Sequence, residues 1–194
     1  MTQSRLSKAL KNEYVKTAIL AIIVIGAVFA FWYGLRWALR TDYPLLAVAS
    51  ESMYPTLTRG DLIVVEWVPA SEIYAAPQTS HPPGDIIVFQ GASVGLPNEL
   101  IVHRAISKFY NNKTGTYYFI THGDNNPPGA NEGPFPDTAV VGKVIYVIPW
   151  IGNVPLFLRT PTGMLLIVFL FLIVILAESI PILVKKTGSE TKAL

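Results

Sequence analysis

Apolar residues gather near both ends of this chain, and the stretch between them alternates short apolar runs with polar breaks. Residues 17–35 (TAILAIIVIGAVFAFWYGL) carry no charge. A helix rises about 1.5 Å per residue, so about 20 apolar residues cross the hydrocarbon core of a bilayer. The pattern therefore predicts a transmembrane helix at residues 17–39.

A second apolar stretch covers residues 163–184, and Glu178 and Pro181 interrupt its later part. The uninterrupted part, residues 164–177, is short for a span. Two interpretations stay open: a second transmembrane helix at residues 163–184, or a buried helix of a soluble domain. In a membrane, Glu178 would have to reach the interface or find a partner, since a charge at the bilayer centre costs about 3 kcal/mol or more.

The charges that flank these stretches predict their orientation. Both tails, residues 1–16 and 185–194, are positive, which favours the cytoplasm. Residues 41–162 hold six Lys or Arg and ten Asp or Glu, a formal charge of −4. We therefore expect a multi-pass protein of the plasma membrane, with both termini cytoplasmic and residues 40–162 outside. The small overall excess of positive charge gives no case for nucleic-acid binding.

The outer region, residues 40–162, has almost no helical periodicity but several short runs of β-branched and aromatic residues, each bounded by Gly, Pro or Asn. The runs are residues 62–68, 85–89, 100–109, 116–121 and 140–148. They predict a mainly β fold, a small antiparallel β domain flanked by N- and C-terminal transmembrane helices. Residues 110–115 predict a hairpin tip, where Asn112 begins a glycosylation sequon. Residues 69–84 and 123–138 are expected to be long loops.

The segment between the first span and the first strand run has two interpretations. Ala47, Val48 and Ala49 resemble the small-residue site at which a signal peptide is cleaved. The preceding apolar run is longer than a signal peptide needs, and Arg36, Arg40 and Asp42 separate it from Ala49, so an uncleaved anchor is favoured. Trp150 and Phe157, just before the second stretch, favour the headgroup level, which predicts a domain lying against the lipid bilayer.

The chain has no cysteine, so covalent chemistry would use Ser, Thr, Lys or a carboxylate. No lysine occurs between Arg40 and Ser107, and the histidines are His81, His103 and His122. Lys108, Lys113 and Lys143 are expected to be solvated. A metal site from His122, Asp124 and His81 is disfavoured because spacing fixes too few ligands, and no cofactor is expected.

Four short boxes together resemble the type I signal peptidases, in the archaeal and endoplasmic-reticulum branch with a histidine base. In chain order they are SESMYPT with Gly60-Asp61, GDIIVF at residues 84–89, His103-Arg104, and GDNN at residues 123–126 with Val141-Gly142-Lys143. The resemblance covers about residues 50–147, and two membrane spans suit an archaeal member.

The resemblance implies a serine protease mechanism. Ser52 would be the nucleophile and His103 the base, while the Ser52 backbone N–H and the Ser50 hydroxyl would hold the oxyanion. An aspartate would orient His103. Asp124 is favoured over Asp137, because this chain has PPGANEGPFPD, with Glu132, where the family has a second aspartate. Glu51 also departs from the family, which has glycine there.

The function so implied is a membrane-bound endopeptidase that cuts signal peptides from pre-proteins after small residues, near the secretion translocase. The alternative is a membrane-anchored, non-catalytic β domain that binds extended peptides by strand addition. A Ser-Lys self-cleaving protease is disfavoured by the missing lysine.

Overall fold

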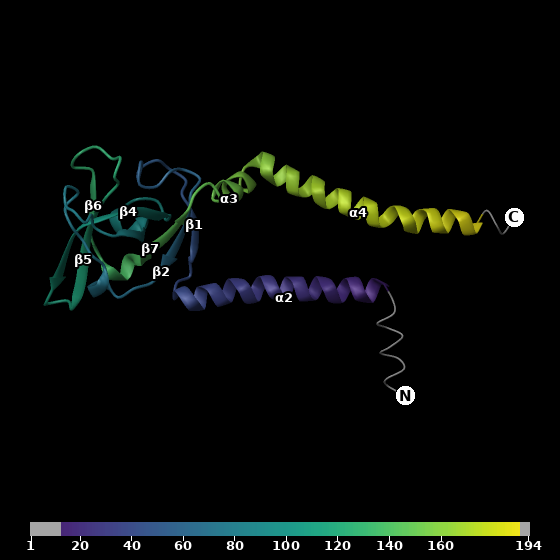
Figure 1. The fold of residues 1–194 in the computed structure, drawn as a ribbon, viewed down its shortest axis with the longest axis horizontal. Helices are drawn as coiled ribbons and strands as arrows, with labels where there is room; N and C mark the ends of the chain where they lie inside the picture. Colours follow the sequence, from purple (N-terminus) through teal and green to yellow (C-terminus); the bar gives the residue numbers. More distant parts are fainter. Residues whose placement is uncertain (1–12, 191–194) are drawn as a thin grey trace, which may run out of the picture.

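The computed structural model describes residues 13–190, and the side chains of residues 15–177 (Figure 1). Helix α2 (Glu13–Leu39) leads into one antiparallel sheet, and helices α3 (Asn153–Leu158) and α4 (Pro161–Glu190) follow it. Most of the tails, residues 1–12 and 191–194, lies outside the described residues, so the predicted cytoplasmic placement of both ends stays a prediction.

The sheet has seven strands in the order β1-β2-β7-β3-β4-β5-β6. The strands are β1 (Leu45–Ala47), β2 (Leu62–Glu66), β3 (Ile86–Gln90), β4 (Leu100–Asn111), β5 (Thr116–His122), β6 (Asn131–Pro136) and β7 (Val140–Ile148). Short 3-10 turns lie between them: η1 (Ala70–Glu72), η2 (Gly91–Val94) and η3 (Asp137–Ala139). The mainly β antiparallel prediction is confirmed, and all five predicted runs form strands.

Both strands at the edges of the sheet were absent from the sequence prediction. β1 has three residues, and β6 runs through a segment predicted to be a loop because it contains Pro134 and Pro136. Proline cannot donate to a strand ladder, but an edge strand has one side without a ladder, so it tolerates proline. β6 pairs only with β5, which explains how a proline-rich segment becomes a strand.

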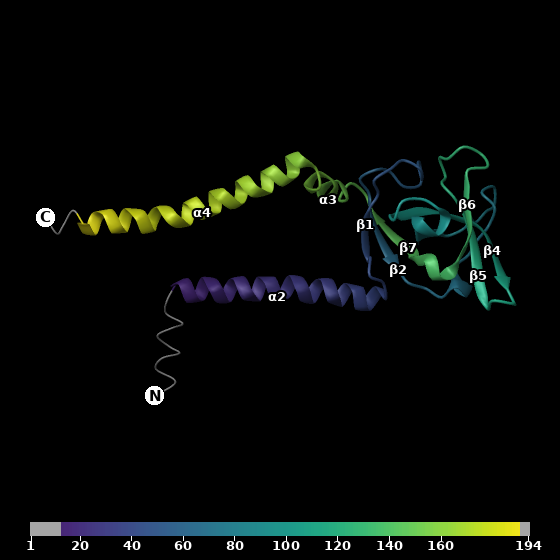
Figure 2. The same cartoon turned by 180° about the vertical axis from the view of Figure 1, so that it is seen from behind.

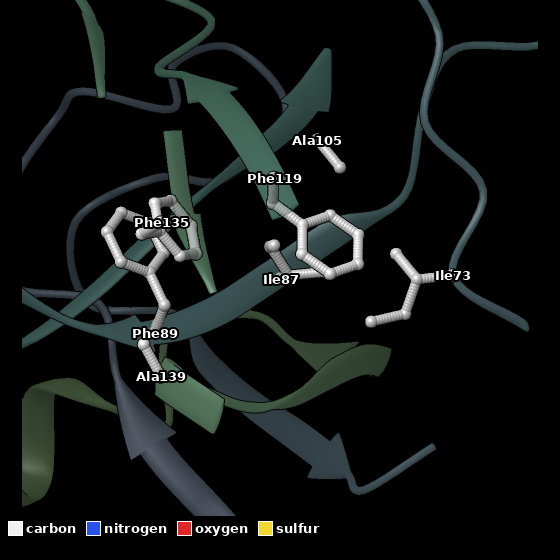
Figure 3. Packing of buried hydrophobic residues seen from close by; sticks show 7 residues of the cluster. All are labelled: Ile73, Ile87, Phe89, Ala105, Phe119, Phe135 and Ala139. Carbon is white, nitrogen blue, oxygen red and sulfur yellow. The ribbon is translucent and has the colours of Figure 1, made fainter. Parts of the chain in front are cut away.

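Two apolar clusters hold the sheet together. The first joins β3, β4, β5, β6 and the segment after η1; Figure 3 shows its members Ile73, Ile87, Phe89, Ala105, Phe119, Phe135 and Ala139. The rings of Phe89 and Phe135 stack with centroids 4.4 Å apart. The second cluster comprises Val48, Met53, Leu57, Ile63, Val65 and Val88. Met53 and Leu57 in this cluster anchor the turn that carries Ser52.

The Ala47-Val48-Ala49 segment is built into the sheet. β1 pairs antiparallel with β2, the Val48 N–H donates to the Asp61 carbonyl at 2.9 Å, and the Val48 side chain is buried in the second cluster. A cut after Ala49 would detach an edge strand and a core side chain. The uncleaved anchor remains the interpretation that fits this packing.

Helix α2 contains the one segment, Val15–Leu39, that is long and apolar enough to cross a membrane among the described residues. In α4 the apolar part for which side chains are described, Pro161–Ala177, is shorter than such a span. Figure 2 shows that α2 and α4 leave the β unit on the same side, the side on which α3 lies. The N-terminal helix therefore fits a membrane protein, and a second span stays a prediction.

Candidate active site

Ser52 lies in a tight turn directly after β1. The Tyr54 N–H donates to the Glu51 carbonyl at 3.0 Å, and the Leu57 N–H donates to the Met53 carbonyl at 2.9 Å. Because Met53 and Leu57 are fully buried, they fix this turn to the core and leave Ser52 at its surface. The Gly-Asp pair that follows closes the turn, since the Asp61 carboxylate accepts the Thr58 N–H at 2.8 Å.

His103 approaches Ser52 from strand β4. It pairs with Ile87 of β3, and its side chain is only 8% exposed. The His103 Nε2 lies 3.0 Å from the Ser52 Oγ, which is hydrogen-bond distance. The Ser50 Oγ lies 3.2 Å from the Ser52 Oγ. The structure therefore brings together the three residues that the sequence singled out from its first and third boxes.

The GDNN box holds the serine turn in place through its backbone. The Asn125 N–H donates to the Ser52 carbonyl at 2.8 Å, and the Asn125 side chain donates to the Glu51 carbonyl at 3.1 Å. A Cβ on Gly123 would lie 2.7 Å from the Ser52 carbonyl oxygen and 2.8 Å from the His103 Nε2. Any side chain there would push serine and histidine apart, so this position requires glycine.

The carboxylate nearest the other nitrogen of His103 belongs to Glu132 on β6. Its Oε2 lies 3.0 Å from the His103 Nδ1, and the Glu132 side chain is 13% exposed. The contact is close but poorly aligned, so the buried Nδ1 has no formed hydrogen bond. Catalytic hydrogen bonds are often poorly aligned before substrate binds.

Asp124, the carboxylate favoured from the sequence, binds Arg104 instead. The Arg104 Nε donates to one carboxylate oxygen at 2.7 Å, and the Arg104 Nη2 and the Thr56 hydroxyl donate to the other, each at 2.5 Å. Burial alone would raise the pKa of Asp124, but the hydrogen bonds from Arg104 and Thr56 and the positive charge of Arg104 outweigh it and lower that pKa. Asp124 therefore ties the GDNN loop to β4 and to the serine turn.

Asp137, the second candidate acid, lies in η3, where its carboxylate accepts the Tyr117 N–H at 3.2 Å. Within the described chain, neither Asp124 nor Asp137 makes a hydrogen bond or ion pair with His103. Sequence reasoning noted Glu132 only as a neighbouring carboxylate. The sequence carried no sign of strand β6, and it is this strand that brings Glu132 opposite Thr121 of β5.

Among the other candidate residues, His122, Lys108 and Lys143 have structural partners. His122 is buried, and its Nδ1 lies 2.9 Å from the Asn131 Oδ1, whereas His81 is exposed on its loop.

Lys108 was expected to be solvated, which is wrong: its Nζ donates to the carbonyls of Ala70, Ser71 and Ile73. Burial lowers the pKa of Lys108, and the Asp85 carboxylate opposes that effect. Lys143 likewise has a partner, 2.8 Å away on Asp85.

A cleft of about 320 Å³ opens beside the Ser52 hydroxyl. One wall is the end of β1 and the serine turn, and the other is the start of β4; the lining residues are Ala47, Val48, Ala49, Ser50, Ser52, Met53, Glu99, Leu100, Ile101, Val102 and His103. β5 pairs with β4 only from Arg104 onward. The preceding part of β4 therefore has a free edge along the cleft.

A serine hydroxyl beside a buried imidazole, with a carboxylate at the far ring nitrogen and a cleft alongside, is the arrangement typical of a serine hydrolase. The apolar helix before it suits attachment to a membrane. Fold and site thus define a class of protein, a serine-hydrolase-like β domain with an N-terminal apolar helix.

Comparison with known proteins identifies the family, although no protein-family model matches the chain. The signal peptidase complex catalytic subunit SEC11 of Tuber melanosporum is 30% identical over 143 residues, which cover 70% of this chain and 74% of the relative. The subunit sec11 of Pyrenophora teres f. teres is 29% identical over 70% of this chain and 75% of its own. SEC11 of Saccharomyces cerevisiae strain YJM789 is 30% identical over 103 residues, which cover 53% of this chain and 54% of the relative.

This chain therefore belongs to the family of endoplasmic-reticulum-type signal peptidase catalytic subunits. The resemblance seen in the four sequence boxes is confirmed. All three relatives named here are fungal and give no support to an archaeal source.

Proposed function

We propose that this protein is a membrane-bound serine endopeptidase that removes signal peptides from secreted pre-proteins through an acyl-enzyme. One observation carries the proposal: the Ser52 hydroxyl lies 3.0 Å from the Nε2 of a buried histidine, beside a cleft. Family membership supplies the substrate class, because the relatives are named signal peptidase catalytic subunits.

In this mechanism Ser52 attacks the scissile carbonyl while His103 takes its proton. His103 then protonates the leaving amine, and water hydrolyses the acyl-enzyme by the reverse sequence of proton transfers. The role of orienting acid passes from Asp124 and Asp137 to Glu132. Glu132 is 3.0 Å from the His103 Nδ1, whereas Asp124 is occupied by Arg104.

The negative charge that develops on the substrate oxygen needs hydrogen-bond donors. The Ser52 backbone N–H and the Ser50 hydroxyl are the proposed donors, since the Ser50 Oγ is 3.2 Å from the Ser52 Oγ. Glu51 between them makes its own contacts through its backbone carbonyl, to Tyr54 and Asn125. Its departure from the family's glycine is thus accommodated in a turn that other residues hold.

The substrate would bind as an extended strand in the cleft. The free edge of β4 before Arg104 offers main-chain groups, which an extended peptide can pair with. Cleavage after small residues is expected from the family. The pre-protein, the lipid bilayer, other subunits of a complex and the secretion translocase are the proposed partners, and the plasma membrane or the endoplasmic-reticulum membrane the proposed location.

The test uses the full chain purified in detergent, with a pre-protein whose apolar segment ends in Ala-x-Ala. We expect a trimmed product whose new N-terminus follows the second alanine. Ser52→Ala should reduce turnover by roughly 10⁴-fold or more without changing the melting temperature, because it removes the hydroxyl that attacks the substrate. A Ser52→Ala protein that still trims the pre-protein, or a wild type that binds without trimming, would overturn the proposal.

A further inference from the structure

Thr121 on β5 contacts the carboxylate that faces His103. The Thr121 hydroxyl donates to the Glu132 Oε2 at 3.0 Å, and this is the same oxygen that lies 3.0 Å from the His103 Nδ1. Thr121 is fully buried in the sheet. In the part of the chain that the structure describes, no other side chain donates a hydrogen bond to Glu132.

Strand register explains how three side chains from three strands meet. Ala105 of β4 pairs with Thr121 of β5, and Thr121 pairs with Glu132 of β6. Side chains two residues apart on a strand share a face, so His103 lies on the face of Ala105. His103, Thr121 and Glu132 therefore share one face, and the small Ala105 leaves space between them.

Hydrogen bonding, rather than packing, explains why a residue with a hydroxyl occupies this buried position. Valine has nearly the shape of threonine and suits a fully buried strand position better. A carboxylate in a sparsely solvated site, by contrast, needs donors to fix its orientation. Without Thr121 the carboxylate would be free to turn from Nδ1, to which it has no aligned hydrogen bond of its own.

We propose that Thr121 is a positioning residue of the peptidase: its hydroxyl holds the Glu132 carboxylate against His103, so that the imidazole keeps the orientation in which it can activate Ser52. This role rests on the proposed function above. The hydroxyl thus acts on the reaction through Glu132 and touches no substrate.

The experiment compares Thr121→Val, which removes the donor, with Thr121→Ser, which keeps it. Thr116→Val is the matched control, because it makes the same substitution on the same strand at its far end, where the Thr116 hydroxyl donates, among the described residues, only to the Thr114 carbonyl. Misplacing a catalytic group by about 1 Å can cost about 100-fold. We expect Thr121→Val to lower kcat by about 10- to 100-fold with KM unchanged, and both other variants to stay within about 3-fold of wild type.

A double variant separates this role from a packing role. In a Glu132→Ala background, Thr121→Val should lower kcat by no more than about 2-fold, because the side chain at position 132 then offers the hydroxyl no acceptor to hold. Wild-type kcat in Thr121→Val, a serine variant as impaired as the valine variant, or additive losses in the double variant would each overturn the proposal. An active Ser52→Ala protein would instead refute the proposed function, so the two failures are distinguishable.

Discussion

Alternation along two neighbouring strands decides which carboxylate meets which partner. Arg104 pairs with His122, so Asp124, two residues beyond His122, falls on the Arg104 side. His103 points to the opposite face, which it shares with Thr121 and Glu132. The two carboxylates therefore have different partners. Asp124 holds the serine turn and the GDNN loop, and Glu132 faces the imidazole of His103.

Replacing Glu132 with glutamine should remove the charge opposite the imidazolium and leave the packing unchanged. By analogy with the best-known triad, turnover should fall roughly 10³- to 10⁴-fold. The melting temperature should change little, because glutamine can still accept the Thr121 hydrogen bond. Full turnover in Glu132→Gln, measured on the pre-protein, would mean that serine and histidine act as a dyad.

Replacing Asp124 with asparagine should instead destabilise the fold. The variant loses two charge-assisted hydrogen bonds from Arg104, so we expect its free energy of unfolding at pH 7 to fall by about 1.5–3 kcal/mol. Because folding lowers the pKa of Asp124, its contribution is complete above the usual value of 3.8 and is lost as pH falls toward the lowered pKa.

Denaturant unfolding at several pH values checks this prediction. The difference between wild type and Asp124→Asn should be constant from pH 5 to 7 and shrink below about pH 4. A variant with wild-type stability but a turnover as low as that of Glu132→Gln would return the orienting role to Asp124.

At the residue scale, the sequence singled out Ser52, His103 and Ser50, which the structure brings within hydrogen-bond distance, because each lies in a short box whose residue types carry the chemistry. It could not single out Glu132. That residue lies in a proline-rich segment without strand alternation, and its meeting with His103 depends on a register that only the folded sheet defines. The alternation of His122 and Asp124 was visible in the sequence, but only the β4–β5 register, in which Arg104 pairs with His122, shows that this face is not the face of His103.

Among the elements, β6 matters most for the site, and it depends on a glycine. Between Phe119 and Thr121 the β5–β6 register shifts, so that Gly133 and Pro134 lie opposite Ile120. Gly133 has φ +110°, and a Cβ there would lie 2.5 Å from the Phe119 carbonyl oxygen. This bulge sets which face Glu132 occupies.

Gly133→Ala should therefore disturb both stability and turnover. Backbone strain of this kind costs about 1–3 kcal/mol, and the close contact with Phe119 adds to it. The matched control is Gly115→Ala at the hairpin tip, which has φ +67° but no atom closer to its Cβ than the Tyr110 Oη at 3.8 Å. Thermal unfolding should show a larger loss for Gly133→Ala, and only that variant should lose turnover. Equal effects on both measurements would show that the bulge does not position Glu132.

The five central strands were predictable because β-branched and aromatic residues fill them between clear turn signals. The edge strands were not, since β1 has three residues and β6 contains two prolines. An edge strand takes its stability from a partner far along the chain, so its own residues carry a weak pattern. β6, which carries Glu132, was thus among the elements least visible in the sequence.

In the whole molecule, both long helices leave the β unit on one side (Figure 2). Exposed apolar residues lie between the end of β7 and α4, among them Trp150, Ile151, Val154 and Phe157. Figure 1 shows α3, which carries Val154 and Phe157, between the sheet and α4. Amphipathic aromatic residues favour the membrane interface. The β unit is therefore expected to lie against the lipid headgroups, where the apolar segment of a pre-protein ends.

The orientation of the whole chain can be tested because the protein contains no cysteine, so that each introduced cysteine is the only one. Asn112→Cys marks the exposed hairpin tip, and Lys8→Cys and Lys192→Cys mark the two basic tails. In sealed vesicles with the outer face exposed, a membrane-impermeant maleimide should label Asn112→Cys at once. The tail cysteines should react only after detergent is added, because basic flanks stay in the cytoplasm.

Lys192→Cys is the decisive variant of the three. Pro161–Ala177 is short for a span, so crossing requires the following residues, including Glu178, to enter the membrane or its interface. Labelling of Lys192→Cys from outside, with Lys8→Cys still protected, would show that the chain crosses once and that α4 lies on the outer surface. Protection of both tails would establish two spans, and labelling of Lys8→Cys from outside would reverse the orientation and move the β unit to the cytoplasm.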